Sequence, residues 1–150
     1  MTRVQTIDEL AALGGQHLGY SDYQQITQEQ VNLSAAATGD HQWIHEDVER
    51  ARNGPFGGTI AHGYLTLSLL PVLLHGVLQV DGVAMGVNYG TNKVRFTSPV
   101  PVGSMIRAGA TLASLEQFEG GATVTLDVVV EVRDETRPAC VAQVIYRYYR

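Results

Sequence analysis

The strongest constraint on the fold is an apolar segment near the middle of the chain. Its apolar residues occupy every side of the helix that they would form, rather than one stripe; they are Leu65, Leu67, Leu69, Leu70, Val72, Leu73, Leu74, Val77 and Leu78. A helix that is apolar all round is buried all round. We therefore expect a helix that begins near His62 and lies inside the protein. Pro71 should kink it, because proline removes one backbone hydrogen bond.

After Asp81-Gly82 the spacing of apolar residues changes to every second position. The most regular run extends from Val124 to Val132, where valine and leucine alternate with threonine, aspartate and glutamate. The same alternation recurs at 94–96, 106–112 and 140–148. Such runs with short connections are typical of antiparallel strands that have one buried face. The sequence thus predicts an α+β fold in which a sheet wraps around the apolar helix.

The composition limits what the domain can be. A chain of 150 residues has room for one core, so residues 1–150 form a single domain. Charged residues make up 17%, against about 25% in average soluble domains, which favours an oligomer that covers part of the surface. The basic residues are scattered, so we expect no nucleic-acid partner. No segment is apolar for long enough to cross a membrane.

The lone cysteine, Cys140, cannot form a disulfide within the chain and falls on the apolar face of a predicted strand. We expect it to be a buried core residue rather than a nucleophile. A reducing compartment suits a protein with one free thiol, and residues 1–15 do not form a signal peptide, so we expect a cytoplasmic location.

The first half of the chain is predicted to be helical. Thr27 and Gln30 have the spacing of a capping box, which opens a helix that continues to about Ala37 and ends at Gly39. One or two further helical turns are expected at 47–52, before a loop at 55–59 that is rich in glycine.

Residues with possible chemistry lie on both sides of that loop. Asp40 and His45, five positions apart in a segment expected to be a loop, could together hold a water molecule for acid–base catalysis. Gly63 is expected in the first turn of the buried helix, where its N–H has no helical partner and can donate to a developing oxyanion. An acid–base pair and an oxyanion donor without a nucleophile suit water addition next to a carbonyl group.

Two simpler interpretations compete with this one. Asp40 could only cap the turn after the preceding helix, since aspartate is common in turns, and His45 could be a histidine of the loop without a catalytic role. His41, His45 and His62 could also bind a metal ion. We expect no metal, because His41 and His45 would both have to lie on one helical face to provide ligand geometry, and the segment is predicted to be a loop.

Residues 38 to 70 resemble the MaoC-like dehydratases, also called (R)-specific enoyl-CoA hydratases. Their motif reads approximately (S/T)-G-D-x-N-P-(L/I)-H, followed by a loop that ends in I-A-H-G. The matching residues are Thr38, Gly39, Asp40, Ile44 and His45, then Ile60, Ala61, His62 and Gly63. The segment 94–100 fits the F-x-x-P-V strand end of the family. Gln42-Trp43 replaces Asn-Pro, and this variant resembles the branch that contains nodulation protein N.

The resemblance implies a hot-dog fold, an antiparallel sheet rolled around one long helix, paired into a homodimer. It also implies reversible hydration of trans-2-enoyl-CoA to (3R)-3-hydroxyacyl-CoA without a cofactor. Asp40 and His45 would then be the catalytic residues, and the Gly63 amide would stabilise the thioester oxygen. The substrate partner would be an acyl-CoA thioester.

Further residues are candidates for substrate binding. Phe56, Tyr64 and Ser68 flank the expected site and could form the walls of an acyl channel, or could be ordinary core residues. Lys93 and Arg95 could bind the phosphates of CoA, or could form a solvated strand face. Trp43 is expected to anchor its loop by packing, because the chain lacks the proline that restricts this turn in most members.

Three other functions remain open on the sequence alone. A thioesterase of the same fold usually needs an acidic residue on the central helix, and the chain has none between His62 and Gln79. A dehydratase of acyl-carrier-protein substrates would use the same two catalytic residues. A non-catalytic acyl-binding protein would need none of Asp40, His45 and Gly63, so their joint presence favours an enzyme.

Overall fold

The computed structural model describes all residues from Met1 to Arg150. The strands are β1 (Thr2–Val4), β2 (His17–Tyr20), β3 (Gln24–Gln25), β4 (Leu78–Val80), β5 (Met85–Arg95), β6 (Met105–Phe118), β7 (Gly121–Val132) and β8 (Cys140–Tyr149). The helices are α1 (Ile7–Ala11), α2 (Gln28–Thr38), α3 (Trp43–Glu46), α4 (Val48–Arg52), α5 (Gly63–Ser68) and α6 (Leu70–His75).

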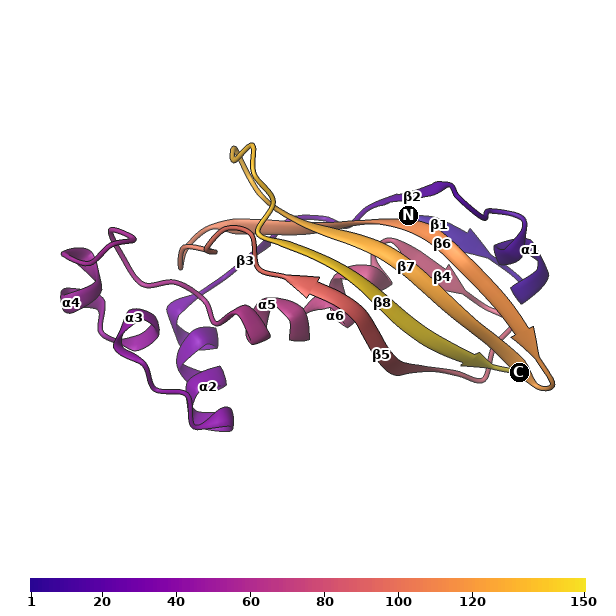
Figure 1. The fold of residues 1–150 in the computed structure, drawn as a ribbon, viewed down its shortest axis with the longest axis horizontal. Coiled ribbons are helices and arrows are strands. Elements are labelled where there is room, and N and C mark those ends of the chain that lie inside the picture. Colours follow the sequence, from indigo (N-terminus) through magenta and orange to yellow (C-terminus); the bar gives the residue numbers. More distant parts are fainter.

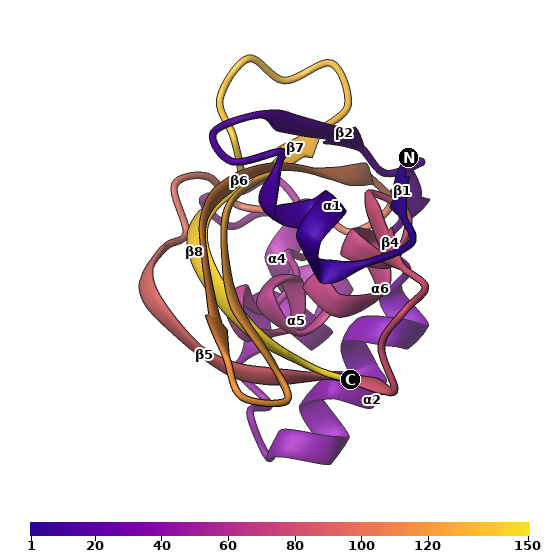
Figure 2. The ribbon, with the colours of Figure 1, turned by 90° about the vertical axis from the view of Figure 1, so that its right-hand side faces the viewer.

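One antiparallel sheet dominates the molecule. Its strands follow the order β2-β6-β7-β8-β5, and β3 pairs with β6 beside β2. The sheet curls around α5 and α6, which lie along its concave face, whereas α2, α3 and α4 form a separate group at one end (Figures 1 and 2). A small parallel pair of β1 and β4 lies at the other end, with α1. This is the hot-dog arrangement that the resemblance implies, so the predicted α+β fold is confirmed.

The alternation in the sequence places every second side chain of the central strands in the core. On β7, Val124, Leu126, Val128 and Val130 are at most 1% exposed, while the residues between them are half-buried or exposed. The prediction for Cys140 is also confirmed, since it lies on β8 with none of its surface exposed.

The central helix differs from its prediction in length and in burial. It is interrupted at Leu69, between α5 and α6, and ends at His75, so that Leu78 belongs to β4. Pro71 lies in the first turn of α6, where its missing N–H costs no helical bond, and it therefore marks a new helix start rather than a kink. The prediction that the helix is buried on every side is wrong for the single chain, because Tyr64 and Val72 are 76% and 61% exposed.

The caps of the first long helix agree with their prediction. The Thr27 hydroxyl accepts a hydrogen bond from the Gln30 N–H at 3.1 Å, and α2 ends at Gly39, whose φ of 81° lies in the left-handed region that glycine adopts readily. The helical turn at 48–52 is present as α4, with Asp47 as its N-cap. The expectation that His45 lies in a loop is wrong, because it belongs to the short helix α3, which begins soon after the turn at Asp40.

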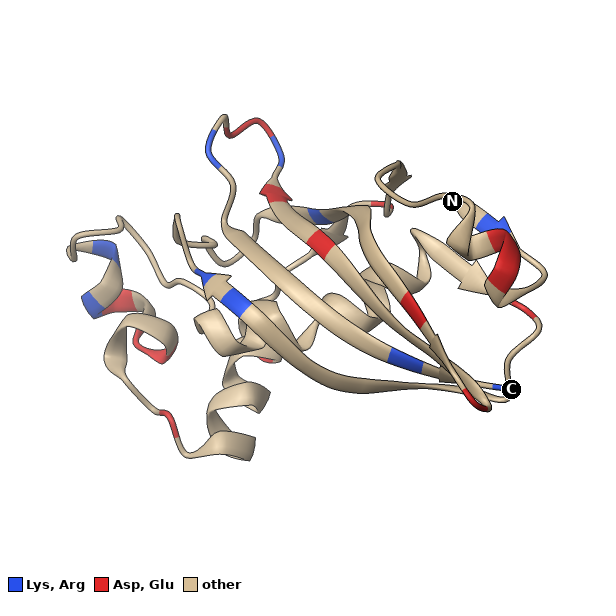
Figure 3. Cartoon of the chain, turned by 45° about the vertical axis from the view of Figure 1, so that its right-hand side comes forward, with Lys and Arg blue, Asp and Glu red and all other residues tan.

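The chain carries few charges, and in the view of Figure 3 acidic and basic residues are interspersed along it. Strand β5, at one end of the sheet, is exposed along almost its whole length, including Met85, Val87 and Tyr89. None of the helices combines the length and the apolar character needed to cross a membrane.

Candidate active site

Asp40 directly follows the left-handed turn at Gly39, and its side chain is exposed at the end of α2. One carboxylate oxygen, Oδ1, accepts a long hydrogen bond of 3.4 Å from the Gln42 N–H, which fixes the turn that leads into α3. Asp40 therefore caps this turn, as the simpler interpretation expects. It leaves the second carboxylate oxygen without a protein partner in this turn.

His45 is buried, with 6% of its surface exposed, although it lies on a helix of only four residues. Its ring nitrogen Nδ1 is 2.7 Å from the main-chain oxygen of Ile60. A carbonyl oxygen can only accept, so Nδ1 carries the proton of this hydrogen bond. In the neutral ring the other nitrogen, Nε2, is then unprotonated and can accept a proton.

A glutamine on α2 forms hydrogen bonds to His45 and to Thr59, the residue before Ile60. The side-chain nitrogen of Gln28 donates to the main-chain oxygen of His45 at 2.7 Å, and its oxygen accepts from the hydroxyl of Thr59 at 2.6 Å. The Ile60 N–H in turn donates to the oxygen of Ile44 at 3.0 Å. Polar contacts thus link the short helix α3 to the segment 59–60.

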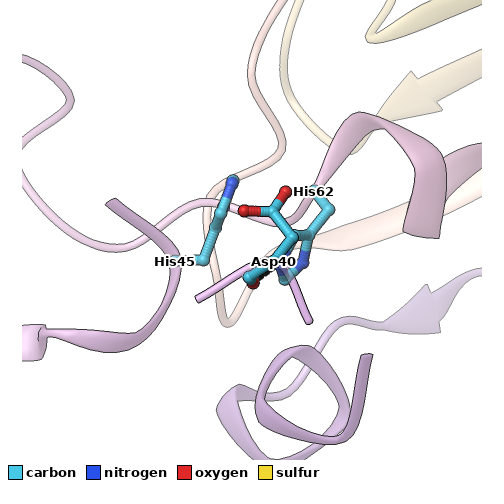
Figure 4. Close-up of side chains that lie close together, drawn as sticks. All are labelled: Asp40, His45 and His62. Carbon is cyan, nitrogen blue, oxygen red and sulfur yellow. Dashed lines mark hydrogen bonds between the residues drawn. The ribbon is translucent and has the colours of Figure 1, made fainter. Parts of the chain in front are cut away.

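A second histidine lies against the first. The rings of His45 and His62 are stacked, with centroids 3.9 Å apart and planes 25° apart, and His62 is only 4% exposed. Asp40 completes the group, and the side chains of these three residues lie together (Figure 4). One possible ligand atom of each residue lies within 4.8 Å of those of the other two. Two polar atoms bridged by one water molecule are roughly 4.5–5 Å apart, so a single water fits between such groups.

The same three residues resemble a metal-binding set in composition, but the ring geometry argues against joint coordination. The lone pair of an imidazole nitrogen lies in the plane of its ring. Two rings stacked 3.9 Å apart in nearly parallel planes direct their lone pairs side by side, and these lone pairs do not converge on one ion at a bond length of about 2 Å. The cluster is therefore better suited to hold water than a metal ion.

A cavity of about 340 Å³ lies beside His45. Gly63, at the start of α5, lines it, and the N–H of this residue has no partner within the helix. The remaining lining residues are Phe56, Ile60, Ala61, Thr66, Phe96, Thr97, Ser98, Pro99, Val100 and Ala139. Phe96 leaves no room for a side chain at position 63, because a Cβ atom on Gly63 would lie 2.7 Å from Cδ2 of Phe96.

The five candidate substrate-binding residues are divided among different surfaces. Phe56 lines the cavity together with His45. Tyr64 packs its ring edge-on against Phe96, with centroids 6.0 Å apart, but points mostly to solvent. Ser68 lines a different cavity, and its hydroxyl donates to the main-chain oxygen of Tyr64.

The two basic candidates lie elsewhere. Lys93 and Arg95 line a groove formed by β5, β7 and β8 that shares no residue with the cavity beside His45. Their role toward phosphate groups gains no support from the site and stays a prediction.

Sequence reasoning misses four residues that shape the site. Phe96 and Thr97 line the cavity, and both belong to the 94–100 segment that matches the family motif, so a signal for them is present in the sequence. His62 belongs to the matching I-A-H-G segment, but its residue type alone suggests only a metal ligand. Gln28 gives no signal, since nothing local distinguishes it from any other polar residue in the first turn of a helix.

Trp43 packs beside the site without lining it. The guanidinium carbon of Arg50 is 4.2 Å from the centre of the indole ring, and a Cβ atom at Gly54 would lie 3.1 Å from the ring. The ring is half-buried rather than fully buried. These contacts to α4 and the following turn support its expected role as a packing anchor.

Comparisons with known proteins place the chain in a family. The family model described as MaoC like domain matches residues 9–134. The chain is 53% identical over 149 residues to 3-hydroxyacyl-thioester dehydratase Z of Mycobacterium tuberculosis, covering 99% of both chains. It is 46% identical over 132 residues to nodulation protein N of Rhizobium leguminosarum bv. viciae, covering 85% of this chain and 81% of that protein.

A solved structure supports the same assignment at the level of the fold. The MaoC-like dehydratase from Rhodospirillum rubrum superposes with a TM-score of 0.76 at 20% identity, covering 96% of both chains. The resemblance predicted from residues 38–70 is therefore confirmed over nearly the whole sequence, and the chain belongs to the MaoC-like domain family.

Proposed function

We propose that the protein is an (R)-specific hydro-lyase that interconverts trans-2-enoyl-CoA and (3R)-3-hydroxyacyl-CoA. Two observations carry the proposal together: possible ligand atoms of Asp40 and His45 lie within 4.8 Å of one another, and His45 lines the same cavity as Gly63, whose N–H has no partner within the helix. Membership of a dehydratase family and the name of the mycobacterial relative, a 3-hydroxyacyl-thioester dehydratase, support the same reaction class.

The reaction needs activation of a water molecule, delivery of a proton to the α-carbon and stabilisation of the thioester oxygen. In the hydration direction, Asp40 and His45 hold one water molecule, remove a proton from it and direct the resulting hydroxide to the β-carbon. A proton is delivered to the α-carbon, so that the elements of water are added across the double bond. The two groups share this proton and are best treated as a coupled pair. The Gly63 N–H donates to the thioester oxygen while that oxygen carries the negative charge of the enolate.

The direct test measures the loss of enoyl-thioester absorbance with crotonyl-CoA and with a longer homologue, followed by chiral analysis of the product. We expect loss of absorbance and a product of (3R) configuration. A (3S) product, or release of free CoA thiol without hydration, would contradict the proposal; the second result would indicate a thioesterase.

A second experiment compares kcat/KM for the same acyl group attached to CoA and attached to acyl carrier protein. We expect CoA to be the better substrate, because the scattered charges on the surface do not form a basic patch for an acidic carrier protein. A kcat/KM at least tenfold higher on the carrier protein would reassign the substrate without changing the chemistry.

We further propose that the working unit is a homodimer. Strand β5 ends the sheet with eleven residues whose outer edge has no strand beside it, and it exposes Met85, Val87 and Tyr89. Long, exposed edge strands are usually covered in native proteins. Size-exclusion chromatography with light scattering should give about twice 16.3 kDa or a multiple of that mass. A monomer at micromolar concentration would exclude this assembly.

A further inference from the structure

We infer that His62 is a positioning residue that fixes Asp40 and His45 in place relative to one another. This role rests on the proposed function, because it concerns the same pair of catalytic residues. Two separate contacts carry it, a hydrogen bond to the main chain of Asp40 and a ring stack on His45.

The hydrogen bond determines which nitrogen of the His62 ring carries the proton. Nε2 of His62 lies 3.0 Å from the main-chain oxygen of Asp40, which can only accept, so Nε2 is the protonated nitrogen. The other nitrogen, Nδ1, is enclosed and has no hydrogen-bond partner. Because a second proton on Nδ1 would find no acceptor, the ring fits this place as the neutral Nε2–H tautomer.

The position of His62 in the chain explains why it can link the two residues. Asp40 lies in an exposed turn after a glycine, with only a long hydrogen bond from Gln42 to hold its carboxylate. The bond from His62 therefore ties this exposed turn to a residue that is itself 4% exposed. His62 is also the N-cap of α5, so it is connected through one peptide bond to the oxyanion donor Gly63.

The ring stack acts on the second catalytic residue. One face of the His45 ring is covered by His62 at 3.9 Å, and one edge is bonded to Ile60. Together these contacts leave the ring little freedom to tilt or rotate. Since a misplacement of about 1 Å can cost about 10²-fold in rate, a residue that fixes both partners affects turnover without touching substrate.

Three variants separate the two contacts. His62→Phe keeps a ring for stacking and lacks the donor, His62→Gln keeps an N–H donor at the position of Nε2 and lacks the ring, and His62→Leu lacks both. We expect kcat to fall about 10²-fold in His62→Phe, with KM within about threefold of wild type, and to recover at least tenfold of that loss in His62→Gln. His62→Leu should be the slowest. His75→Gln, which changes an exposed histidine at the end of α6, serves as the control and should keep wild-type kcat.

Coupling to Asp40 distinguishes positioning from a general structural role. In an Asp40→Asn background, His62→Phe should cause little further loss, because the group that it positions is no longer functional. Full additivity of the two losses would overturn the inference, as would wild-type kcat in His62→Phe. Equal losses in Phe and Gln that follow a lower melting temperature would assign His62 to folding alone.

A measurement on the wild-type protein keeps the inference testable if a variant does not fold. Nitrogen-15 NMR of the histidine side chains reports the tautomer of each ring, and we expect the Nε2–H form for His62. A proton on Nδ1 would overturn the inference, whatever the activity. Conversely, a wild-type protein with the expected tautomer but no turnover of any enoyl or hydroxyacyl thioester would contradict the proposed function and not the geometry.

Discussion

The central strands and the segment from Gln28 to His62 are stabilised in different ways. On β6, β7 and β8, main chains pair along ten or more residues, and every second side chain enters one shared apolar core. In the segment, the buried side chains are few, and the functional groups are held by bonds between side chains and main chain, such as those of Gln28 and His62. Apolar packing supplies stability over a large area, whereas a few directional bonds supply position.

This difference predicts that stability and catalysis can be changed separately. Loss of apolar volume in the sheet should lower the free energy of unfolding and leave the chemistry of the remaining folded protein unchanged. Loss of one polar group in the segment should lower kcat and leave the melting temperature almost unchanged. Variants that fail to separate in this way would show that the two regions are more strongly coupled than their contacts indicate.

The largest expected effect is on the proposed catalytic pair, Asp40 and His45. Asp40→Asn and His45→Gln should each lower kcat about 10²–10⁴-fold, the usual range for groups of acid–base catalysis. The fold should survive, because Asp40 is exposed and His45 packs on a short helix outside the main core. Steady-state kinetics with crotonyl-CoA and thermal melts measure both effects.

The double variant sharpens this result. Because both groups act on one water, Asp40→Asn with His45→Gln should be little slower than the slower single variant. Independent, additive losses would show that the residues do not work as a pair. Wild-type turnover in either single variant would remove that residue from the mechanism.

The opposite behaviour is expected for Leu112→Ala in β6. Leu112 has none of its surface exposed and belongs to the main core, so the cavity left by this change should cost about 2–5 kcal/mol of unfolding free energy. Urea unfolding gives this value, and kcat measured well below the transition should stay within about twofold of wild type. A large loss of kcat in protein that is still folded would break the distinction between the two regions.

Gly63→Ala tests the junction between the regions. The added methyl group would lie 2.7 Å from Phe96, so either this ring or the start of α5 must move, and both line the cavity. We expect kcat to fall about 10–10²-fold. Gly58→Ala is the matched control, because no atom lies within 4 Å of the position that its added methyl group would occupy, and it should keep wild-type kcat.

The sequence predicts the sheet more completely than the segment from Gln28 to His62, because a sequence pattern reports local structure and not contacts between distant residues. Alternation of valine and leucine reports burial directly, so the strands and the buried state of Cys140 follow from periodicity. The capping residues Thr27 and Gly39 are local signals, and their prediction is confirmed as well. The exposure of Val72 could not be predicted, because an apolar residue gives the same pattern whether its own chain or another molecule covers it.

The contacts of the site depend on residues far apart in the sequence. Gln28 reaches Thr59 across 31 positions, and His62 reaches Asp40 across 22. No local pattern encodes such pairs, so motif matching includes His62 without indicating its contact to Asp40, and it does not identify Gln28 at all. The prediction that His45 lies in a loop is wrong because the four residues of α3 are too few to show a helical period.

Trp43→Ala should give a smaller and mixed effect. Since the ring is half-buried against Arg50 and Gly54, its loss should cost about 1–3 kcal/mol rather than the larger amount for a fully buried indole. The turn that carries Asp40 and His45 should loosen, which lowers kcat/KM for short and long enoyl-CoA substrates alike. Altered chain-length preference at an unchanged melting temperature would instead make Trp43 a substrate contact.

The smallest expected effect concerns the sheet alone and appears only in alkaline solution. Burial raises the pKa of the Cys140 thiol from its ordinary value near 9 to about 11. A group whose pKa is higher in the folded state contributes its full stability below the unfolded pKa and loses it as the pH rises through the folded pKa. Between pH 7 and pH 9.5 this thiol should therefore cost the protein under about 1 kcal/mol. Urea unfolding at the two pH values, for wild type and Cys140→Ala, measures it: the wild type should lose more stability than the variant, since the variant has no thiol to ionise. Equal losses in both proteins would show that other groups, such as the half-buried Tyr146 with its pKa raised by burial to about 12, cause the alkaline change.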